Sequence, residues 1–273
     1  MTEAVNRESY GAAADKLAAV AEGADSGRIT EVADELLAVA DLLRREPRLR
    51  RALSDPARSG DDRAELLRAV LDGKVSAEAI DLASALVAGR WSTPGELLNA
   101  VERLGVDAVL TSAERADELG DVEDELFRFG QVVSGDTHLA AALADASADV
   151  ERRASLVRDL LEDKVRPATL RLALLALAGF GGRGFAASLT RLVELAAQKR
   201  DHSVAYVTTA VPLTDADEER LAARLADMYG RAVSLKIDVD PRIIGGMRVK
   251  VGSDLYDGTV VRRLTEARTA LTK

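Results

Sequence analysis

Residues 60–75 read GDDRAELLRAVLDGKV, and residues 150–165 read VERRASLVRDLLEDKV, so the two stretches share an offset of 90 residues. Extended outward without a gap, this register places residues 34–89 over residues 124–179, with 18 identities in 56 positions. A regular internal repeat indicates a repeated folding unit, and two copies are fewer than a solenoid usually needs. The register therefore predicts a duplicated helical unit.

Both copies carry the apolar spacing of amphipathic helices. Apolar residues recur at intervals of three and four, and prolines fall between the stripes, where helices must end. An earlier stripe predicts a leading helix. The marker residues are Tyr10, Leu17 and Val20 in the leading helix, Leu36, Val39, Leu43, Leu67, Leu71, Leu82 and Leu86 in the first copy, Phe127, Val133, Val157, Leu161 and Leu170 in the second, and the prolines Pro47, Pro56 and Pro94.

The pattern changes near residue 201. Apolar residues alternate with polar ones in three segments, which is typical of strands, and Thr214 can cap a helix between the first two. A last apolar stripe at spacings of four, three and four predicts a final helix. The strands are expected at 203–211, 233–239 and 247–251, and the final helix carries Val260, Leu264, Ala267 and Leu271. The fold class is thus mainly α, with a helical domain over 1–200 and a small α/β module over 201–273.

Composition excludes several kinds of site. The chain has no cysteine, which rules out disulfides and thiolate ligands, and two histidines make a zinc site improbable without carboxylates beside them. The net charge of −9 argues against binding to a phosphate backbone as the main task. No uncharged run reaches the roughly 20 apolar residues of a membrane span. The start, Met1-Thr2-Glu3, lacks the features of a signal peptide, so we expect a soluble, cytoplasmic protein.

A glycine-rich stretch, residues 243–252, invites two interpretations. A loop that binds phosphate should open directly into a helix, whose N-terminus then faces the anion. Here Gly245 and Gly246 open into an alternating strand, which favours a structural turn or bulge. No cofactor or metal site is expected, and neither His138 nor His202 belongs to an arrangement that predicts catalysis.

Two further features could bind partners. Residues 44–51 contain the one dense basic cluster, which could touch nucleic acid or anionic lipid, but the matching stretch of the second copy has no arginine. A solvated face is therefore the favoured interpretation of the cluster. Grooves between alanine-rich helices could also accept an amphipathic helix of a partner, although any helical bundle has grooves.

Several short motifs resemble one family. The chain contains Val207-Thr208-Thr209-Ala210, then Ile244-Gly245-Gly246, Val251-Gly252 and Asp257-Gly258-Thr259-Val260. Their order and spacing resemble the C-terminal signature of the delta subunit of F-type ATP synthase, the family of the oligomycin-sensitivity-conferring protein. Tyr10-Gly11-Ala12-Ala13-Ala14 is similar to the opening helix of that family, and Leu53-Ser54-Asp55-Pro56 and Gly89-Arg90 are similar to its later helical motifs.

The resemblance implies a non-catalytic stator subunit without a cofactor, in a complex that couples proton transport to ATP synthesis. Such a subunit binds the N-terminal helices of alpha subunits of the catalytic head, and its C-terminal part binds the b subunits of the peripheral stalk. It would lie at the cytoplasmic face of the plasma membrane. The motif places structural roles on Gly245, Gly246, Gly252, Asp257 and Gly258. The apolar face of the final helix makes Val260, Leu264 and Leu271 candidate partner contacts.

The chain departs from the family pattern in length, since the extra copy adds about 90 residues. The second copy runs directly into the C-terminal module, as the single copy of the family does, so we take it as the equivalent. Two alternatives stay open at this point. One is a helical-repeat adaptor unrelated to ATP synthesis, and the other is an enzyme that uses the glycine turn for a nucleotide. The strand of Met247, Val249 and Val251 and the final helix each have one apolar face, and we expect some of this surface to stay available to a partner helix.

Overall fold

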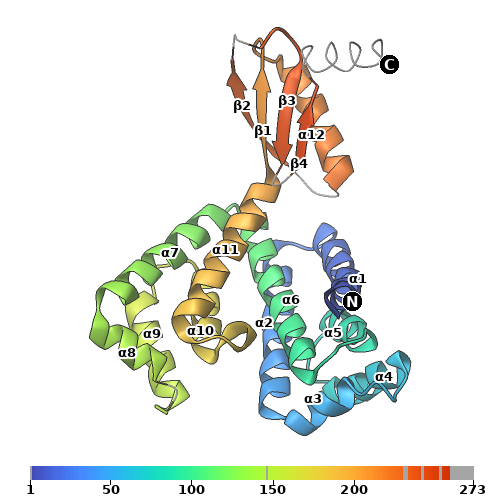
Figure 1. Cartoon of the computed structure of the whole chain (residues 1–273), viewed down its shortest axis with the longest axis vertical. Coiled ribbons are helices and arrows are strands. Elements are labelled where there is room, and N and C mark those ends of the chain that lie inside the picture. The colour runs from blue at the N-terminus through green and yellow to red at the C-terminus, as the bar shows by residue number, and fades with distance from the viewer. Residues whose placement is uncertain (1, 146, 230–232, 241–242, 252–253, 259–273) are drawn as a thin grey trace. The chain divides into compact units, whose positions relative to one another are not determined.

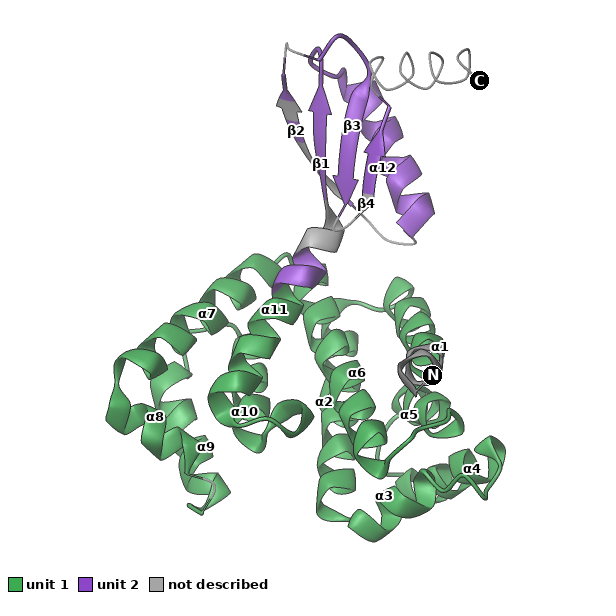
Figure 2. Ribbon diagram, in the orientation of Figure 1, with its two compact units in different colours: residues 1–196 green, residues 197–273 purple. Residues whose placement is uncertain are grey.

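The computed structural model describes residues 2–145, 147–229, 233–240, 243–251 and 254–258 (Figure 1). The chain divides into a helical unit, residues 1–196, and a C-terminal unit, residues 197–273 (Figure 2). Twelve α-helices, one short 3-10 helix and four strands lie within the described residues. The prediction of a mainly helical fold with a small α/β part at the C-terminal end is confirmed.

The helical unit is built from α1 to α11, the last of which runs on into the C-terminal unit. Its first half contains α1 (Thr2–Glu22), α2 (Ser26–Arg45), α3 (Pro47–Leu53), α4 (Gly60–Leu71), α5 (Ala77–Ala88) and α6 (Pro94–Arg115). Its second half contains α7 (Leu119–Gly135), α8 (Thr137–Ala144), α9 (Val150–Leu161), α10 (Pro167–Ala178), η1 (Phe180–Gly182) and α11 (Phe185–Ser203). Helix α9 begins and ends 90 residues after α4, and α10 begins and ends 90 residues after α5. This is the offset of the sequence repeat.

Equivalent local interactions repeat at the same offset. Glu35 accepts a hydrogen bond from the backbone N–H of Ser76, and Glu125 accepts one from the backbone N–H of Arg166. Lys74 donates to the carbonyl of Val70 at 2.7 Å, as Lys164 does to that of Leu160 at 3.0 Å. These bonds satisfy helix termini, whose N–H and C=O groups lack partners within the helix. The two segments therefore share helix ends as well as helix positions.

Helix α6 takes part in both halves of the helical unit. It packs along α2, and it also lies against α10, as α1 lies against α5 in the first half (Figure 1). One hydrophobic core accordingly runs through all of these helices. Glu102 of α6 joins the halves further: it is 1% exposed, pairs with Arg44 at 2.8 Å and accepts a hydrogen bond from the N–H of Gly181 at 2.7 Å. A buried carboxylate is stable only with such partners.

The C-terminal unit is a four-stranded mixed sheet with one helix against it. The strand order is β2-β1-β3-β4, with β1 parallel to β2 and antiparallel to β3, and β3 antiparallel to β4. Helix α12 provides the crossover that the parallel pair β1 and β2 requires. The elements are β1 (Val204–Thr209), α12 (Asp215–Tyr229), β2 (Ser234–Val239), β3 (Met247–Val251) and β4 (Asp254–Asp257).

The core of this unit lies between the sheet and α12. Ala205 and Val207 of β1, Val249 and Val251 of β3, and Leu225 of α12 are all buried there. The apolar face of β3 is therefore not available to a partner, and the final helix, the other surface expected to stay available, lies outside the described residues. The strand alternation was predicted from the sequence, but the helix that covers it belongs to the tertiary structure.

Another detail of the C-terminal unit also differs from expectation. The spacing of Leu221, Leu225 and Met228 predicts that all three lie on one apolar face of α12, yet Met228 is 60% exposed. A side chain on that face is expected to point at the sheet and to be buried. Leu225 does so and is 4% exposed. Met228 lies one residue from the end of α12 and is left outside the core.

Candidate functional site

The glycines of the family motif shape the loop into β3 and the end of β4. Gly245 and Gly246 have φ values of 150° and 83°, a backbone region that favours glycine, and the strand β3 follows directly. The N–H of Gly258 donates to the carbonyl of Met247 at 2.9 Å, and Asp257 pairs with Arg248 across the two strands at 3.5 Å. These contacts join the open end of the β3–β4 hairpin, and the interpretation of Gly245 and Gly246 as a structural turn that leads into β3 fits the fold.

Several of the predicted site residues cannot be placed. Gly252, Val260, Leu264 and Leu271 lie outside the described residues. The proposed roles of the final helix therefore rest on the sequence alone. Among the described residues, no group of three histidine, aspartate or glutamate side chains could hold a metal ion. His138 is exposed at the start of α8, and its backbone N–H donates to Asp136.

The basic cluster of residues 44–51 is largely used inside the helical unit. Arg44 pairs with Glu102 and with Asp41, and Arg45 also pairs with Asp41. Arg50 donates to the carbonyl of Leu43 at the junction of α2 and α3. Part of the cluster is thus held by contacts within the helical unit, while Arg45, Arg48 and Arg51 remain exposed to solvent.

The tyrosine of the opening motif ties α1 to α6. Its hydroxyl donates a short hydrogen bond to Asp107, which also pairs with Arg103 at 2.9 Å. Burial, followed by the negative charge of Asp107, raises the pKa of Tyr10 far above its ordinary value. Tyr10 therefore remains a neutral donor, which suits a structural link between these helices.

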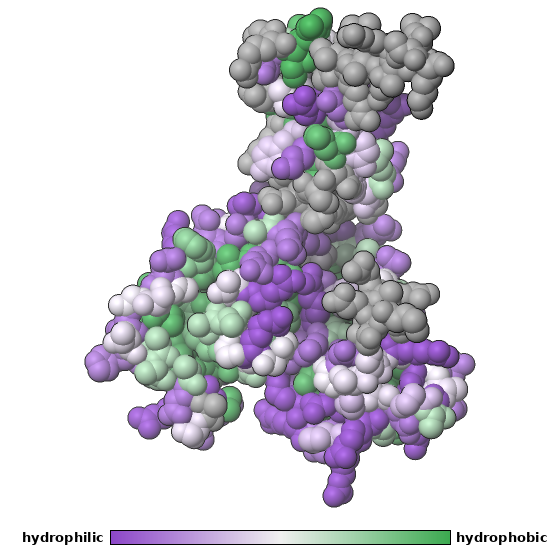
Figure 3. Space-filling view, viewed as in Figure 1, coloured by the Kyte–Doolittle hydropathy of each residue, from purple (hydrophilic) through white to green (hydrophobic). Residues whose placement is uncertain are grey.

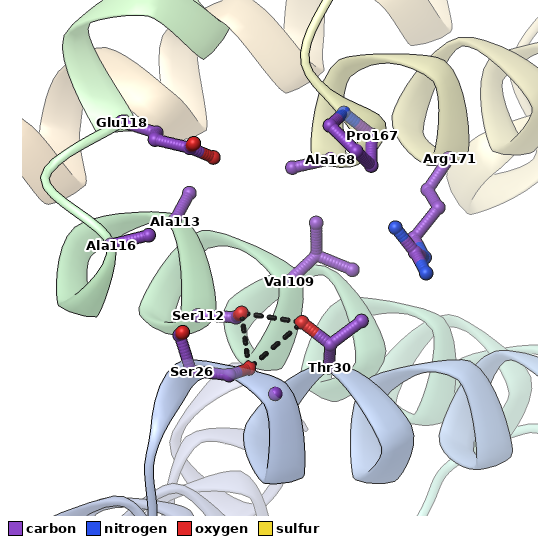
Figure 4. A pocket seen from close by; sticks show the side chains of 11 residues that line it. Ser26, Thr30, Val109, Ser112, Ala113, Ala116, Glu118, Pro167, Ala168 and Arg171 are labelled. Atoms are coloured by element: carbon purple, nitrogen blue, oxygen red, sulfur yellow. Dashed lines mark hydrogen bonds between the residues drawn. The ribbon is translucent and has the colours of Figure 1, made fainter.

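One hollow in the helical unit is a helix-lined groove of about 370 Å³ (Figure 4). Val109 and Ala113 of α6 face Pro167 and Ala168 of α10 across it, and Arg171 lies at one end (Figure 4). A polar cluster forms its floor, where the hydroxyls of Thr30 and Ser112 lie 2.6 Å apart and both donate to the carbonyl of Ser26. The groove is thus apolar on its walls and polar below.

The second hollow, of about 750 Å³, lies where the loop between α3 and α4 meets the end of α5. We call it the arginine cavity. It is lined by Ser54, Pro56, Arg58, Ser59, Gly60, Arg63, Ala88, Arg90, Trp91 and Ser92. Three of these residues are arginines and none is a carboxylate. This site was not predicted from the sequence, although Trp91, the single tryptophan of the chain, and Arg58 and Arg90, which have no arginine counterpart in the second copy, were available signals.

A buried arginine holds the arginine cavity together. Arg63 is 4% exposed and donates to the carbonyls of Asp55 at 3.0 Å, Ala88 at 3.1 Å and Gly89 at 2.8 Å. It therefore joins the loop before α4 to the end of α5. Trp91 is fixed by a hydrogen bond of 2.7 Å from its indole Nε1–H to the carbonyl of Leu86.

The outer surface of the helical unit differs between its halves. On the face shown in Figure 3, hydrophobic colour is more frequent over α7 to α9 than over α3 and α4. Among the residues of this unit whose burial is described, the exposed large apolar ones are Phe127, Val132 and Val150, all in the second half. Within the described residues, no helix is both long enough and apolar enough to cross a membrane.

Comparison with known proteins gives a consistent result. The family described as "ATP synthase delta (OSCP) subunit" matches residues 9–104 and 106–271. The chain is similar to ATP synthase subunit delta of Salinispora arenicola, with 60% identity over 100% of both chains, and to that of Salinispora tropica, with 58% identity over the same span. It is 45% identical to ATP synthase subunit delta of Streptomyces griseus, over 96% of each chain.

These relatives match over nearly their whole length, so the long form with two helical copies is common to them. A chain of the Toxoplasma gondii mitochondrial ATP synthase hexamer is similar over 62% of this chain and 95% of its own. Its TM-score is 0.33 at 16% identity, which is too weak a likeness to place any element of this chain.

Proposed function

Because the chain belongs to the ATP synthase delta (OSCP) family, a non-catalytic stator component of the F-type ATP synthase, we propose that its two units bind different partners within that complex. The helical unit binds N-terminal helices of alpha subunits, and the C-terminal unit binds the b subunits of the peripheral stalk. The family assignment excludes the alternative of an adaptor unrelated to ATP synthesis. The complex would hold the chain at the cytoplasmic face of the plasma membrane.

The groove of Figure 4 is the observation that carries the first half of this proposal. Its walls are small apolar residues, such as Ala113 and Ala168, which let an incoming helix approach closely. It lies between α2, α6 and α10, so the second copy, which we take as the equivalent of the single copy of the family, contributes one of its walls. An amphipathic helix would place its apolar side chains between α6 and α10.

The division between partners can be tested by truncation. A chain that ends at Lys199 keeps the whole helical unit and loses the sheet. We expect it to capture a peptide of the alpha N-terminus and to fail to capture the b subunits in a pull-down. Circular dichroism would verify that the shorter chain is folded. Retention of b binding would place the stalk contact on the helical unit instead.

The groove itself can be tested by filling it. Ala168→Trp should block the groove and weaken capture of the alpha peptide by about tenfold or more, as loss of a central contact commonly does. Ala142→Trp provides the matched control, because Ala142 is exposed on α8, outside the groove. Equal capture by both variants would exclude this groove as the binding site.

A further inference from the structure

The strongest additional feature of the molecule is the arginine cavity. Arg58, Arg63 and Arg90 line it without a carboxylate among the lining residues, in a chain whose net charge is −9. Among the described residues, the only ion pair recorded for these three arginines joins Arg58 to Asp55, at the long distance of 4.0 Å. Its volume of about 750 Å³ lies within the usual size range of ligand-binding clefts.

The cavity is a property of the first copy alone. At the 90-residue offset, Arg58 corresponds to Ala148, Arg90 to Phe180 and Trp91 to Gly181. Phe180 is buried in the core. The second copy therefore has a buried apolar side chain at the position where the first copy has the exposed cation of Arg90. Arg58, Arg90 and Trp91 are therefore not required by the helical plan that the two copies share, whereas Arg63 recurs as Arg153.

The geometry holds the cavity open before any ligand arrives. Arg63 fixes the loop to the end of α5 through three carbonyls, and Trp91 is fixed through Leu86. Arg58 and Arg90 are exposed at the rim. Since the cavity is preformed, a ligand would not have to order it, which favours binding.

We infer that the arginine cavity binds an acidic peptide segment of a partner protein. Guanidinium groups bind carboxylates through paired, charge-assisted hydrogen bonds. Trp91 adds an apolar wall, which suits a peptide that carries an apolar side chain beside its carboxylates and has no use in binding a bare inorganic anion. The site is separate from the groove of Figure 4, because the two hollows share no lining residue.

Trp91 provides a direct readout, because it is the single tryptophan of the chain. The full-length protein would be titrated with a synthetic peptide of four glutamates flanked by leucines, with tryptophan fluorescence recorded. Three other probes would be the same peptide with lysines for glutamates, sodium phosphate, and ATP. We expect saturation with the glutamate peptide only, and weaker binding at higher salt.

Rim variants test the site itself. Arg58→Gln and Arg90→Gln should each weaken binding of the glutamate peptide by about tenfold, the effect of losing a charge-assisted contact. Arg152→Gln is the control, because it removes the same charge from an exposed site on α9. Equal weakening by all three variants, or the absence of saturation with the glutamate peptide, would overturn the inference. Tighter binding of phosphate or ATP would also overturn it and would make the cavity a phosphate site.

Discussion

The two helical copies have the same order of helices, but the contact between α4 and α5 in the first copy differs from that between α9 and α10 in the second. In the first copy, a Cβ atom on Gly60 would lie 2.6 Å from the carbonyl oxygen of Ala88, so α4 begins in direct backbone contact with the end of α5. The second copy has Val150 at this position, and Val150 is 55% exposed. A side chain there excludes the same close approach.

The conserved arginine of each copy reflects this difference. Arg63 reaches three carbonyls, including those of Ala88 and Gly89 at the end of α5. Arg153 occupies the same repeat position, yet its one recorded hydrogen bond goes to the carbonyl of Leu143 at 3.4 Å. An identical residue can therefore act as a three-way link or as a weak local contact, depending on how closely the neighbouring helices approach.

Removal of one copy is the strongest way to test this comparison. Deletion of residues 34–123 joins equivalent points of α2 and α7 and removes α6, but it leaves α1 to take the place of α6 against α10. We expect a shorter, helical protein that unfolds cooperatively, measured by circular dichroism with urea. A product without helical signal would show that the copies share one inseparable core.

Among single substitutions, we expect the largest difference in the free energy of unfolding between variants of Arg63 and of Arg153, which occupy the same repeat position. Arg63→Met leaves three carbonyls without their donor and should lower the free energy of unfolding by about 3 kcal/mol. Arg153→Met removes one long hydrogen bond and should cost about 1 kcal/mol or less. Urea unfolding followed by circular dichroism would measure both. Equal losses would contradict the three-way role of Arg63.

The close approach at Gly60 predicts a smaller difference. Gly60→Val introduces a Cβ into the backbone of Ala88 and should cost about 2 kcal/mol through overpacking. The fluorescence of Trp91 would report the loss in the first copy. Val150→Gly, the reciprocal change at an exposed site, is the control and should cost about 0.5–1 kcal/mol. A tolerated Gly60→Val would mean that the two helix ends can separate freely.

The smallest effect is expected on the surface of α7. Phe127 is 55% exposed. Its counterpart in the first copy, Leu37, packs closely against Gly105: a Cβ atom added to Gly105 would lie 2.7 Å from Cδ2 of Leu37. Phe127→Ser should change the free energy of unfolding by about 0.5 kcal/mol or less, whereas Leu37→Ser should cost about 2 kcal/mol. Thermal unfolding of both variants would decide. A large loss for Phe127→Ser would reveal a hidden contact on α7.

Much of the fold could be predicted because it is local. Helix positions follow from apolar spacing and proline breaks, and the 90-residue offset predicted that α9 and α10 repeat α4 and α5. The β1, β2 and β3 segments followed from alternation. The strand β4 did not, because Asp254–Asp257 is a short segment with acidic ends, and its assignment to the sheet depends on pairing with β3.

Periodicity shows which face of an element is apolar. The order and spacing of the motifs from Val207 to Val260 were sufficient to indicate the family. The sequence alone therefore determined the helical class, the repeat and the stator assignment. Only the tertiary structure decided that α6 takes part in both halves, that α12 covers β3, and that Arg58, Arg63 and Arg90 line one cavity. The physical reason is that an apolar stripe or a charged side chain does not specify which distant element will meet it. Packing makes that choice through close approaches such as the one at Gly60.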